Sequence, residues 1–173
     1  SEIFGLPSGM VNRTALEGED EVRLYHEDWA SAVEQRISAP VLALMSIECE
    51  YNAENRNLHT HTSVKFLEAI ENDIEIVLYI IEDNIVSWQK DYDHDPVDIE
   101  NYNHRHVFRD AINTTWGENI ISDGATQGQL VNRMHDYTLN TNWIAENCEV
   151  IAYIYNAETG EIIQVEHAKV ISE

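Results

Sequence analysis

The sequence predicts a mainly β protein, a β-sandwich with one short helix near the N-terminus. Segments in which apolar and polar residues alternate recur along the chain, as expected for strands with one buried face. Turn residues interrupt these segments roughly every eight to twelve residues, a spacing typical of all-β sandwiches. With 173 residues, 43% of them apolar, the chain can form one domain with a substantial core.

The segment with the clearest helical period lies near the N-terminus. In residues 28–37, Trp29, Val33 and Ile37 recur four apart and form one apolar stripe. Pro40 then prevents the helix from continuing, because it lacks a backbone N–H and clashes with the preceding turn. We expect this stripe to cover one end of the core.

Three strands are predicted in the first half of the chain, at residues 41–51, 58–69 and 74–82, separated by short turns. The buried face of the second strand is expected to carry Leu58, Thr60, Thr62, Val64 and Phe66. The third strand has apolar residues on both faces, with Ile74, Ile76, Leu78 and Ile80 on one and Val77, Tyr79 and Ile81 on the other. It is therefore predicted to be a central strand covered on both sides.

The middle of the chain has weaker patterns. Residues 85–89 either continue the third strand or form another one, and residues 104–112 fit a strand or a helical turn. Residues 91–102 are interpreted as a loop, because they are rich in Asp and contain Pro96. Residues 117–128, which are bounded by glycines, are interpreted as a second loop.

The C-terminal part predicts a strand at residues 129–140 and a single helical turn at residues 141–147. The clearest hairpin of the chain joins residues 148–155 to residues 161–167. Its connection places Gly160 where a short hairpin loop needs a positive φ angle.

The chain is strongly acidic, with 32 Asp and Glu against 10 Lys and Arg and a net charge of −22. Such a charge repels nucleic-acid phosphates, so nucleic acid is not expected as a partner. It favours solubility and could attract basic partners or divalent cations. No stretch of about 18 apolar residues is present, so the sequence predicts no membrane-spanning helix.

A segment rich in His, Arg and aromatic residues stands out in this acidic chain. We call residues 102–117, YNHRHVFRDAINTTWG, the signature segment. It resembles the Tyr-x-His-x-His-Val-x-Arg … Trp-Gly-Glu pattern of a Bacteroidetes family of outer-membrane lipoproteins, described as outer membrane protein of about 28 kDa. Residues 81–89, 143–156 and 158–165 resemble further segments of that family, in matching order.

This resemblance implies an outer-membrane, cell-surface location, with a lipid anchor on a segment outside this chain. It also implies an immunoglobulin-like sandwich and a preceding thioredoxin-like domain. Residues 5–13, which include Gly5, Leu6 and Pro7, look like the Gly-x-Pro loop near the end of a thioredoxin-like domain. We therefore expect residues 1–27 to be the tail of that domain plus a linker, and residues 28–173 to form the sandwich.

The two cysteines, Cys49 and Cys148, both lie in phase with inward-facing residues of their predicted strands. In an exported protein they could form a buried disulfide. Two separate buried thiols that act as small apolar groups are the favoured alternative. No Cys-x-x-Cys motif is present, so thiol redox chemistry has no local support in the sequence.

Histidine pairs give one candidate metal site. His59 and His61 are two residues apart on a predicted strand, so both side chains leave the same face. His104 and His106 would do the same if their segment is extended, and two such pairs on neighbouring strands would make a four-nitrogen site. The simpler interpretation is hydrogen-bonded histidines on the polar face of a sheet.

An acidic segment gives a second candidate metal site. Asp91, Asp93 and Asp95 are spaced like the first oxygen ligands of a calcium loop. Pro96 stands where an EF-hand needs Gly, and Tyr102 stands where it needs a bidentate Glu, so the segment is not an EF-hand. An irregular Ca²⁺ loop and a plain solvated loop both stay open, the second being favoured, and no other cofactor is expected.

The signature segment also suggests a buried arginine. Arg109, paired with Asp110 or Glu118 and covered by Trp116, would fix a loop across the end of the sandwich. The alternative is a ligand pocket or protein-contact patch, because aromatic and arginine side chains are favoured in interfaces. Its candidate residues are His104, His106, Arg109 and Trp116.

No catalytic fingerprint such as Gly-x-Ser-x-Gly, His-Glu-x-x-His or a P-loop occurs in the sequence. We therefore expect a non-catalytic cell-surface domain of an outer-membrane lipoprotein, with a binding, adhesion or receptor role and a protein, peptide or glycan as its partner. The alternative is an accessory domain that supports a redox-active thioredoxin-like domain. A domain that binds divalent metal is a weaker alternative, and the sequence assigns no oligomeric state.

Overall fold

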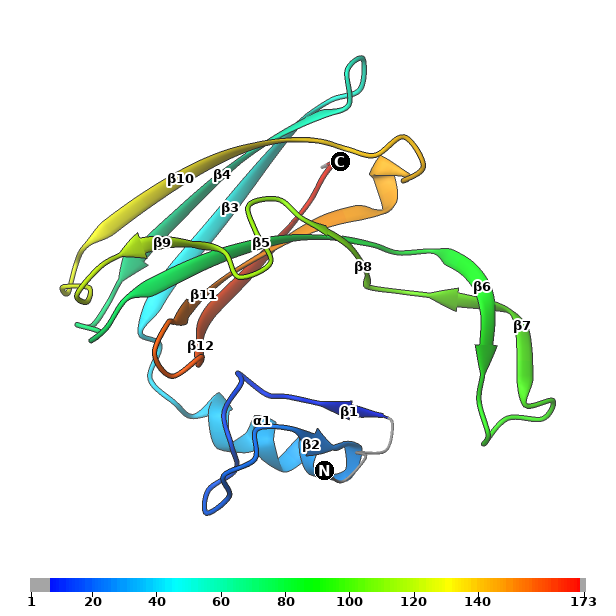
Figure 1. Ribbon diagram of the computed structural model, residues 1–173, viewed down its shortest axis with the longest axis horizontal. Helices are drawn as coiled ribbons and strands as arrows, with labels where there is room; N and C mark the ends of the chain where they lie inside the picture. The colour runs from blue at the N-terminus through cyan, green and yellow to red at the C-terminus, as the bar shows by residue number, and fades with distance from the viewer. Residues whose placement is uncertain (1–6, 172–173) are drawn as a thin grey trace.

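Two antiparallel sheets pack face to face in the computed structural model, which describes residues 7–171 (Figure 1). One sheet has the order β10-β4-β3, formed by Leu130–Thr138, Asn57–Phe66 and Ala43–Asn52. The other has the order β12-β11-β5-β8, formed by Ile162–Lys169, Cys148–Asn156, Ile74–Glu82 and Val107–Ala111. A short strand, β9 (Glu118–Ile121), also pairs with β5. The predicted mainly β sandwich is confirmed.

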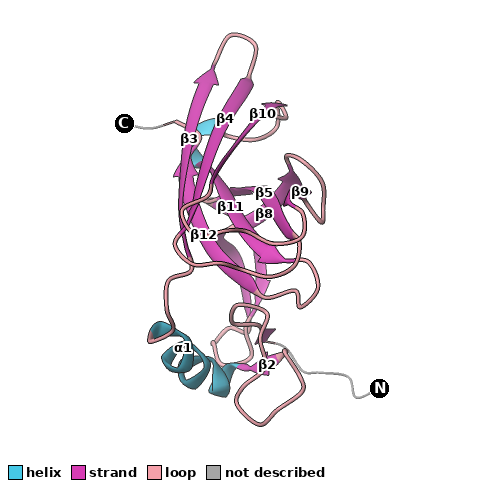
Figure 2. Ribbon diagram, turned by 90° about the vertical axis from the view of Figure 1, so that its left-hand side faces the viewer, coloured by secondary structure: helices cyan, strands magenta, loops and turns pink. Residues whose placement is uncertain are grey.

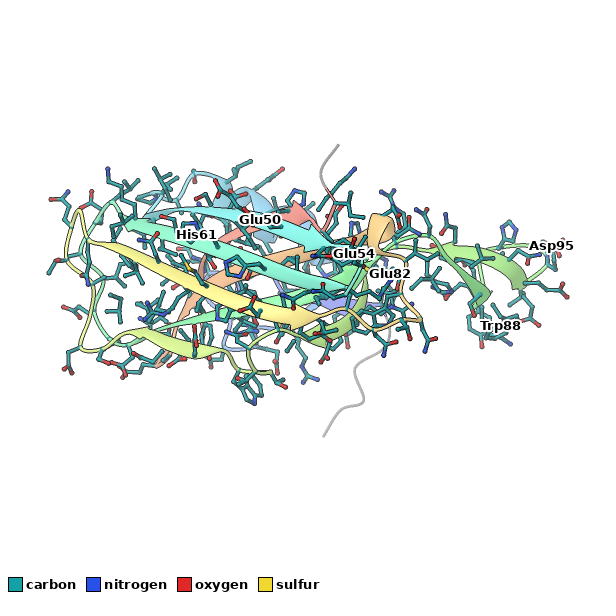
Figure 3. All side chains as sticks on the ribbon, turned by 90° about the horizontal axis from the view of Figure 1, so that it is seen from above. Glu50, Glu54, His61, Glu82, Trp88 and Asp95 are labelled. Atoms are coloured by element: carbon teal, nitrogen blue, oxygen red, sulfur yellow. The ribbon has the colours of Figure 1, made fainter. Side chains whose placement is uncertain are left out.

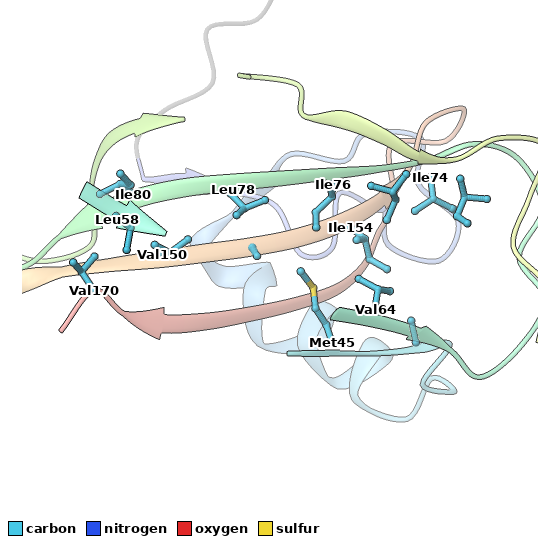
Figure 4. Packing of buried hydrophobic residues seen from close by; sticks show 14 of the residues in the cluster. Met45, Leu58, Val64, Ile74, Ile76, Leu78, Ile80, Val150, Ile154 and Val170 are labelled. Carbon is cyan, nitrogen blue, oxygen red and sulfur yellow. The ribbon is translucent and has the colours of Figure 1, made fainter. Parts of the chain in front are cut away.

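The core lies between the two sheets (Figure 4) and includes the apolar residues that alternation assigned to the inward faces of β4 and β5. It also includes Ile120, Ile121 and Ala125, from a segment interpreted as a loop. The predicted inward face of β4 is buried along its whole length. Strand β5 is covered on both sides as predicted, since Ile76 and Val77 are both fully buried. Each fully buried aliphatic side chain contributes about 1.5–3 kcal/mol relative to an exposed one, so this strand is a main source of stability.

The N-terminal part forms a small element of its own beside the sandwich. It contains β1 (Ser8–Gly9), β2 (Leu24–Tyr25), the 3₁₀ turn η1 (His26–Asp28) and helix α1 (Trp29–Ile37). The backbone carbonyl of Asn12 accepts a hydrogen bond from Ile162 of β12 (2.9 Å) and so ties this element to the sheet. Gly5 and Leu6, part of the loop likened to a thioredoxin-like domain, lie outside the described residues, and the boundary at residue 27 stays a prediction.

The predicted helix is confirmed, but its predicted role is wrong. Its apolar stripe does not cover the core: Trp29, Val33 and Ile37 are all exposed, Ile37 to 80%. The helix lies below the sandwich (Figure 2). Its Trp29 ring packs against Gly9 of β1. Ala32 is its only buried residue.

Two segments interpreted as loops contain strands. Residues 98–104 form β7 (Asp98–His104), which pairs with β6 (Ile85–Lys90), and β9 lies within the predicted loop 117–128. The predicted helical turn at 141–147 is the 3₁₀ turn η2 (Ala145–Asn147). The β11–β12 hairpin is confirmed, and Gly160 in its loop has a φ of +78°.

The crossing from one sheet to the other, between β10 and β11, is held by polar contacts, most of them partly buried. The guanidinium of Arg56 donates hydrogen bonds to the carbonyls of Leu139, Asn140 and Trp143, at 3.1, 2.8 and 2.9 Å. One carboxylate oxygen of Glu82 accepts the Ile144 N–H at 2.9 Å. These bonds satisfy backbone groups that no strand partner reaches, which fixes where the chain re-enters the second sheet.

Candidate binding surface

The signature segment and the short strand that follows it pair along one edge of β5. Strand β8 pairs with β5 from Tyr79 to Glu82, and β9 pairs with it from Ile74 to Ile76. The side-chain amide of Asn113 fills the gap between them, accepting from the Leu78 N–H (3.1 Å) and donating to the Ile76 carbonyl (2.9 Å). Asn113 thus replaces a strand partner at this point. The backbone groups of β5 stay hydrogen-bonded in the gap between β8 and β9.

Gly117 allows the chain to turn back towards β5 at close range. Its φ is +85°, and a Cβ built on it would lie 2.2 Å from the Ile76 carbonyl oxygen. Glycine is therefore required both by the left-handed backbone and by the contact with β5.

Arg109 is half-buried, not buried as predicted, and its ion-pair partner is a different acid. Its Nε lies 2.7 Å from the carboxylate of Glu82, which is 3% exposed. Neither acid predicted as its partner forms this pair: Asp110 accepts from Tyr137 (2.7 Å), and Glu118 lies 3.0 Å from His135. The register between β5 and β8 sets this pairing across 27 residues of sequence. Glu82 also accepts from Ile144, so the pair links β5, β8 and the β10–β11 crossing.

Trp116 does not pack over Arg109, contrary to the prediction. Its side chain is 72% exposed. Only its carbonyl has a tertiary hydrogen bond, accepting from the Tyr155 hydroxyl at 2.8 Å. The indole is therefore free to contact another molecule.

An elbow divides one long hairpin into two parts. Strands β5 and β6 are interrupted at Asp83 and Asn84, and β7 and β8 at Arg105 and His106. Asn84 and His106 both have positive φ angles, 61° and 52°, which bend the hairpin at that level. Beyond the bend, β6 and β7 form a projecting arm (Figure 1).

Asp83 holds the elbow together. Its carboxylate accepts the His106 backbone N–H at 2.6 Å and lies 3.7 Å from Arg105 Nε. The hydrogen bond from His106, with help from the nearby positive charges, lowers the pKa of the Asp83 carboxyl. The chemistry of the elbow thus favours the ionised acid that bridges the two strands.

The elbow also overturns the predicted four-histidine site. His104 ends β7 and His106 lies in the bend, so the two do not share an extended strand. His59 and His61 lie on β4, whose neighbours are β3 and β10, not β7 or β8. Their rings instead contact Asp136 (3.0 Å) and Asn132 (3.3 Å).

Asp91, Asp93 and Asp95 lie in the loop at the far end of the arm (Figure 3). The Asp91 carboxylate accepts the Asp93 backbone N–H at 3.0 Å, a local bond typical of an Asx turn. Within residues 7–171 no group of three or more His, Cys, Asp or Glu side chains converges in a way that could hold a metal ion.

The two cysteines are separate thiols in this structure, Cys49 on β3 and Cys148 on β11. Burial raises the pKa of Cys49 to about 11. Burial, followed by the nearby Glu82 carboxylate, raises the pKa of Cys148 to about 12. Both thiols are therefore held in the protonated, unreactive form at neutral pH.

We predict that native protein reacts slowly with DTNB at pH 8, whereas protein unfolded in guanidinium reacts with both thiols rapidly. The raised pKa values leave little thiolate, and the fully buried Cys148 is also out of reach. Fast reaction of two thiols in the native state would contradict the buried arrangement. Absence of reaction after unfolding would indicate a disulfide instead.

The outer face of the five-stranded sheet carries a hollow that the sequence did not reveal. Three apolar side chains line it, Ile81, Ile151 and Val165, and its volume is about 460 Å³. Charged and titratable side chains line it as well: His106, Glu149, Glu166 and His167, with the Glu149 carboxylate 3.1 Å from the His167 ring. Phe108 lies on the strand next to Ile81 and is 56% exposed, with its ring edge-on to Tyr79 at 5.1 Å.

The N-terminal element covers another part of this face, around Tyr153 and Tyr155. Arg13 donates to the Tyr153 hydroxyl at 2.8 Å and lies over the rings of Tyr153 and Tyr155, at 5.1 and 5.3 Å. The hollow lies outside this cover, at the foot of the arm, because His106 of the elbow lines it. Of the predicted binding residues His104, His106, Arg109 and Trp116, only His106 borders the hollow, and no single site gathers all four.

The fold and this surface define a β-sandwich domain with a projecting arm and an exposed apolar hollow. A family model for outer membrane protein Omp28 matches residues 2–173, so the chain belongs to the Omp28 family of outer membrane proteins. The resemblance of the signature segment is thereby confirmed, and the protein is assigned to the outer membrane. No curated protein sequence matches the chain.

A crystal structure of a domain of the outer membrane lipoprotein Omp28 from Porphyromonas gingivalis has a similar fold. The two sequences are 20% identical, the TM-score is 0.52, and the match covers 75% of this chain and 88% of that chain. At this identity the likeness supports the fold alone. No helix in the described part of the chain is long and apolar enough to span a bilayer.

Proposed function

We propose that this domain is a non-catalytic binding module of an outer-membrane lipoprotein, with an adhesion or receptor role at the cell surface. The observation that carries the proposal is the hollow between Ile81, Ile151 and Val165, with the exposed Phe108 beside it. A lipid anchor outside this chain would hold the module at the membrane. The strand orders β3-β4-β10 and β12-β11-β5-β8 support the immunoglobulin-like topology that is common among surface-binding domains.

The composition of the hollow suits contact with a protein or peptide. Its lining combines apolar with charged side chains, as interfaces do, and in an interface a few apolar anchors supply most of the binding energy. Covering Phe108 and Val165 would remove two partly exposed apolar side chains from water. Each would contribute up to about 1.5–3 kcal/mol on full burial.

The test is binding of the purified domain to intact cells and envelope preparations, using two double variants. In the first, Phe108→Ser and Val165→Ser alter the hollow. In the second, Leu44→Ser and Met134→Ser alter the outer face of the other sheet, where Met134 is 64% exposed and so comparable with Phe108. We expect the first variant to lose saturable binding and the second to keep it. Equal binding by both, with unchanged melting temperatures, would refute the proposal.

A second candidate function, support of a neighbouring domain, is favoured by helix α1. Its exposed Trp29, Val33 and Ile37 form an apolar face on the N-terminal element that the sandwich does not cover. A preceding domain packed on this face would account for it. The two unpaired cysteines, half-buried Cys49 and buried Cys148, have raised pKa values and give this module no redox chemistry of its own in that arrangement.

A further inference from the structure

One face of the arm carries exposed aromatic side chains around the ammonium group of its own Lys90. Val86, Trp88 and Lys90 alternate along β6, so they share one face. The Lys90 ammonium lies 5.7 Å from the ring centres of both Trp88 and Tyr92. It also lies 3.4 Å from the Asp98 carboxylate. Two aromatic rings and a carboxylate around an ammonium group are the elements of a cation–π site.

This face of the arm is exposed, although such side chains are costly to leave in water. Trp88 is 53% exposed and Tyr92 81% exposed, and Trp88 projects from the side of the arm (Figure 3). Within the described residues β6 and β7 pair only with each other, so each has one edge of unpaired backbone groups. An isolated two-stranded hairpin is marginally stable in water, and a third strand would stabilise it.

The charge of the arm selects the kind of partner. Between residues 85 and 104 there is one lysine, Lys90, and no arginine. The same segment carries the carboxylates of Asp91, Asp93, Asp95, Asp98 and Glu100. A second copy of this chain, with its net charge of −22, would bring repulsive charge to this surface. A basic partner would gain both Coulomb attraction and the aromatic rings.

We propose that the arm captures an extended segment of a partner protein that is rich in Lys and Arg. The segment adds a strand to the free edge of the arm, and its cationic side chains lie on the Trp88 and Tyr92 rings and the surrounding carboxylates. This inference rests on the proposed binding function and specifies one class of partner for it. Lys90 shows in the structure that these rings and the Asp98 carboxylate can surround an ammonium group.

The probe is a blocked, fluorescein-labelled octapeptide of alternating Lys and Val, compared with one of alternating Glu and Val. Fluorescence anisotropy with the purified domain measures both. We expect only the Lys peptide to bind, with affinity that falls as salt is raised. Replacing Trp88 and Tyr92 together with alanine is expected to weaken it at least about tenfold, equivalent to one partly desolvated cation–π contact.

Trp116→Ala is the matched control, because Trp116 is an exposed tryptophan that lies outside the arm. The inference is overturned if both peptides bind equally, if neither binds, or if the arm variant binds the Lys peptide as tightly as the control does. The Phe108→Ser, Val165→Ser variant separates the two proposals. If that variant loses cell binding and the Lys peptide does not bind the arm, the inference about the arm is wrong and the role of the hollow stands. If the Lys peptide binds the arm and that variant still binds cells, the role of the hollow is wrong and the inference about the arm stands.

Discussion

Replacing Gly117 with alanine is expected to destabilise the domain by about 3 kcal/mol. The new Cβ would lie 2.2 Å from the Ile76 carbonyl oxygen and 2.7 Å from Val77 Cγ2, both on the most buried strand of the protein. The φ angle of +85° adds backbone strain for any residue with a side chain. For a domain of this size the melting temperature should fall by roughly 6–12 °C, measured by circular dichroism.

Gly128→Ala provides the matched control. Its φ of +82° is almost the same, but a Cβ at that position meets nothing within 4 Å. It should cost about 1 kcal/mol, the backbone term alone. An equal loss of stability in both variants would contradict the close contact between residue 117 and β5.

Removing the carboxylate of Glu82 is expected to have a comparable effect. Glu82→Ala leaves Arg109 without its partner at 2.7 Å and the Ile144 N–H without an acceptor. Breaking a buried ion pair from one side costs about 3–5 kcal/mol, and the lower end applies because Arg109 is partly exposed. Glu82→Gln keeps an acceptor for Ile144 and should lose less. Urea unfolding of the three proteins gives the comparison.

The control for Glu82 is an ion pair of the same type on the surface. Glu161 lies 3.4 Å from Arg36, and both side chains are substantially exposed. Glu161→Ala should therefore change the free energy of unfolding by less than about 1 kcal/mol. A Glu82→Ala variant that unfolded like Glu161→Ala would show that the pair does not hold the β10–β11 crossing.

Alternation predicted the strands that build the core. Strand β5 has the predicted bounds, and its two apolar faces correctly indicated cover on both sides. The inward face of β4 was also predicted residue by residue. Both strands bury at least one face in the core. Their buried residues therefore recur at every second position, which is visible in the sequence.

Strands β7 and β9 escaped prediction for an identifiable reason. Residues 85–89, by contrast, were predicted to extend the third strand or to form a strand of their own, and they form β6. Strand β7 is exposed along almost its whole length, so burial imposes no period on its sequence. Strand β9 has four residues, too few for a pattern to stand out beside the flanking glycines. Ile99 and Tyr102 were the available signals, since both residue types favour strands.

The contacts of the signature segment depend on the register in which β8 pairs with β5. Its Arg109 finds Glu82 only because β8 pairs with β5 in one particular register, and its Asn113 and Gly117 act on the backbone of β5. These residues hold the edge of the sheet. The exposed hollow beside them is formed largely by Ile151 and Val165, from strands much later in the chain.

The most direct test of the account is site-specific photo-crosslinking of the protein on intact cells. A photoreactive phenylalanine analogue would replace Phe108, Trp88 or, as the control on the opposite sheet, Met134. We predict discrete crosslinks from Phe108 and Trp88 and none from Met134, because binding is assigned to the hollow and the arm. Crosslinks from Met134 with none from the other two positions would contradict that assignment.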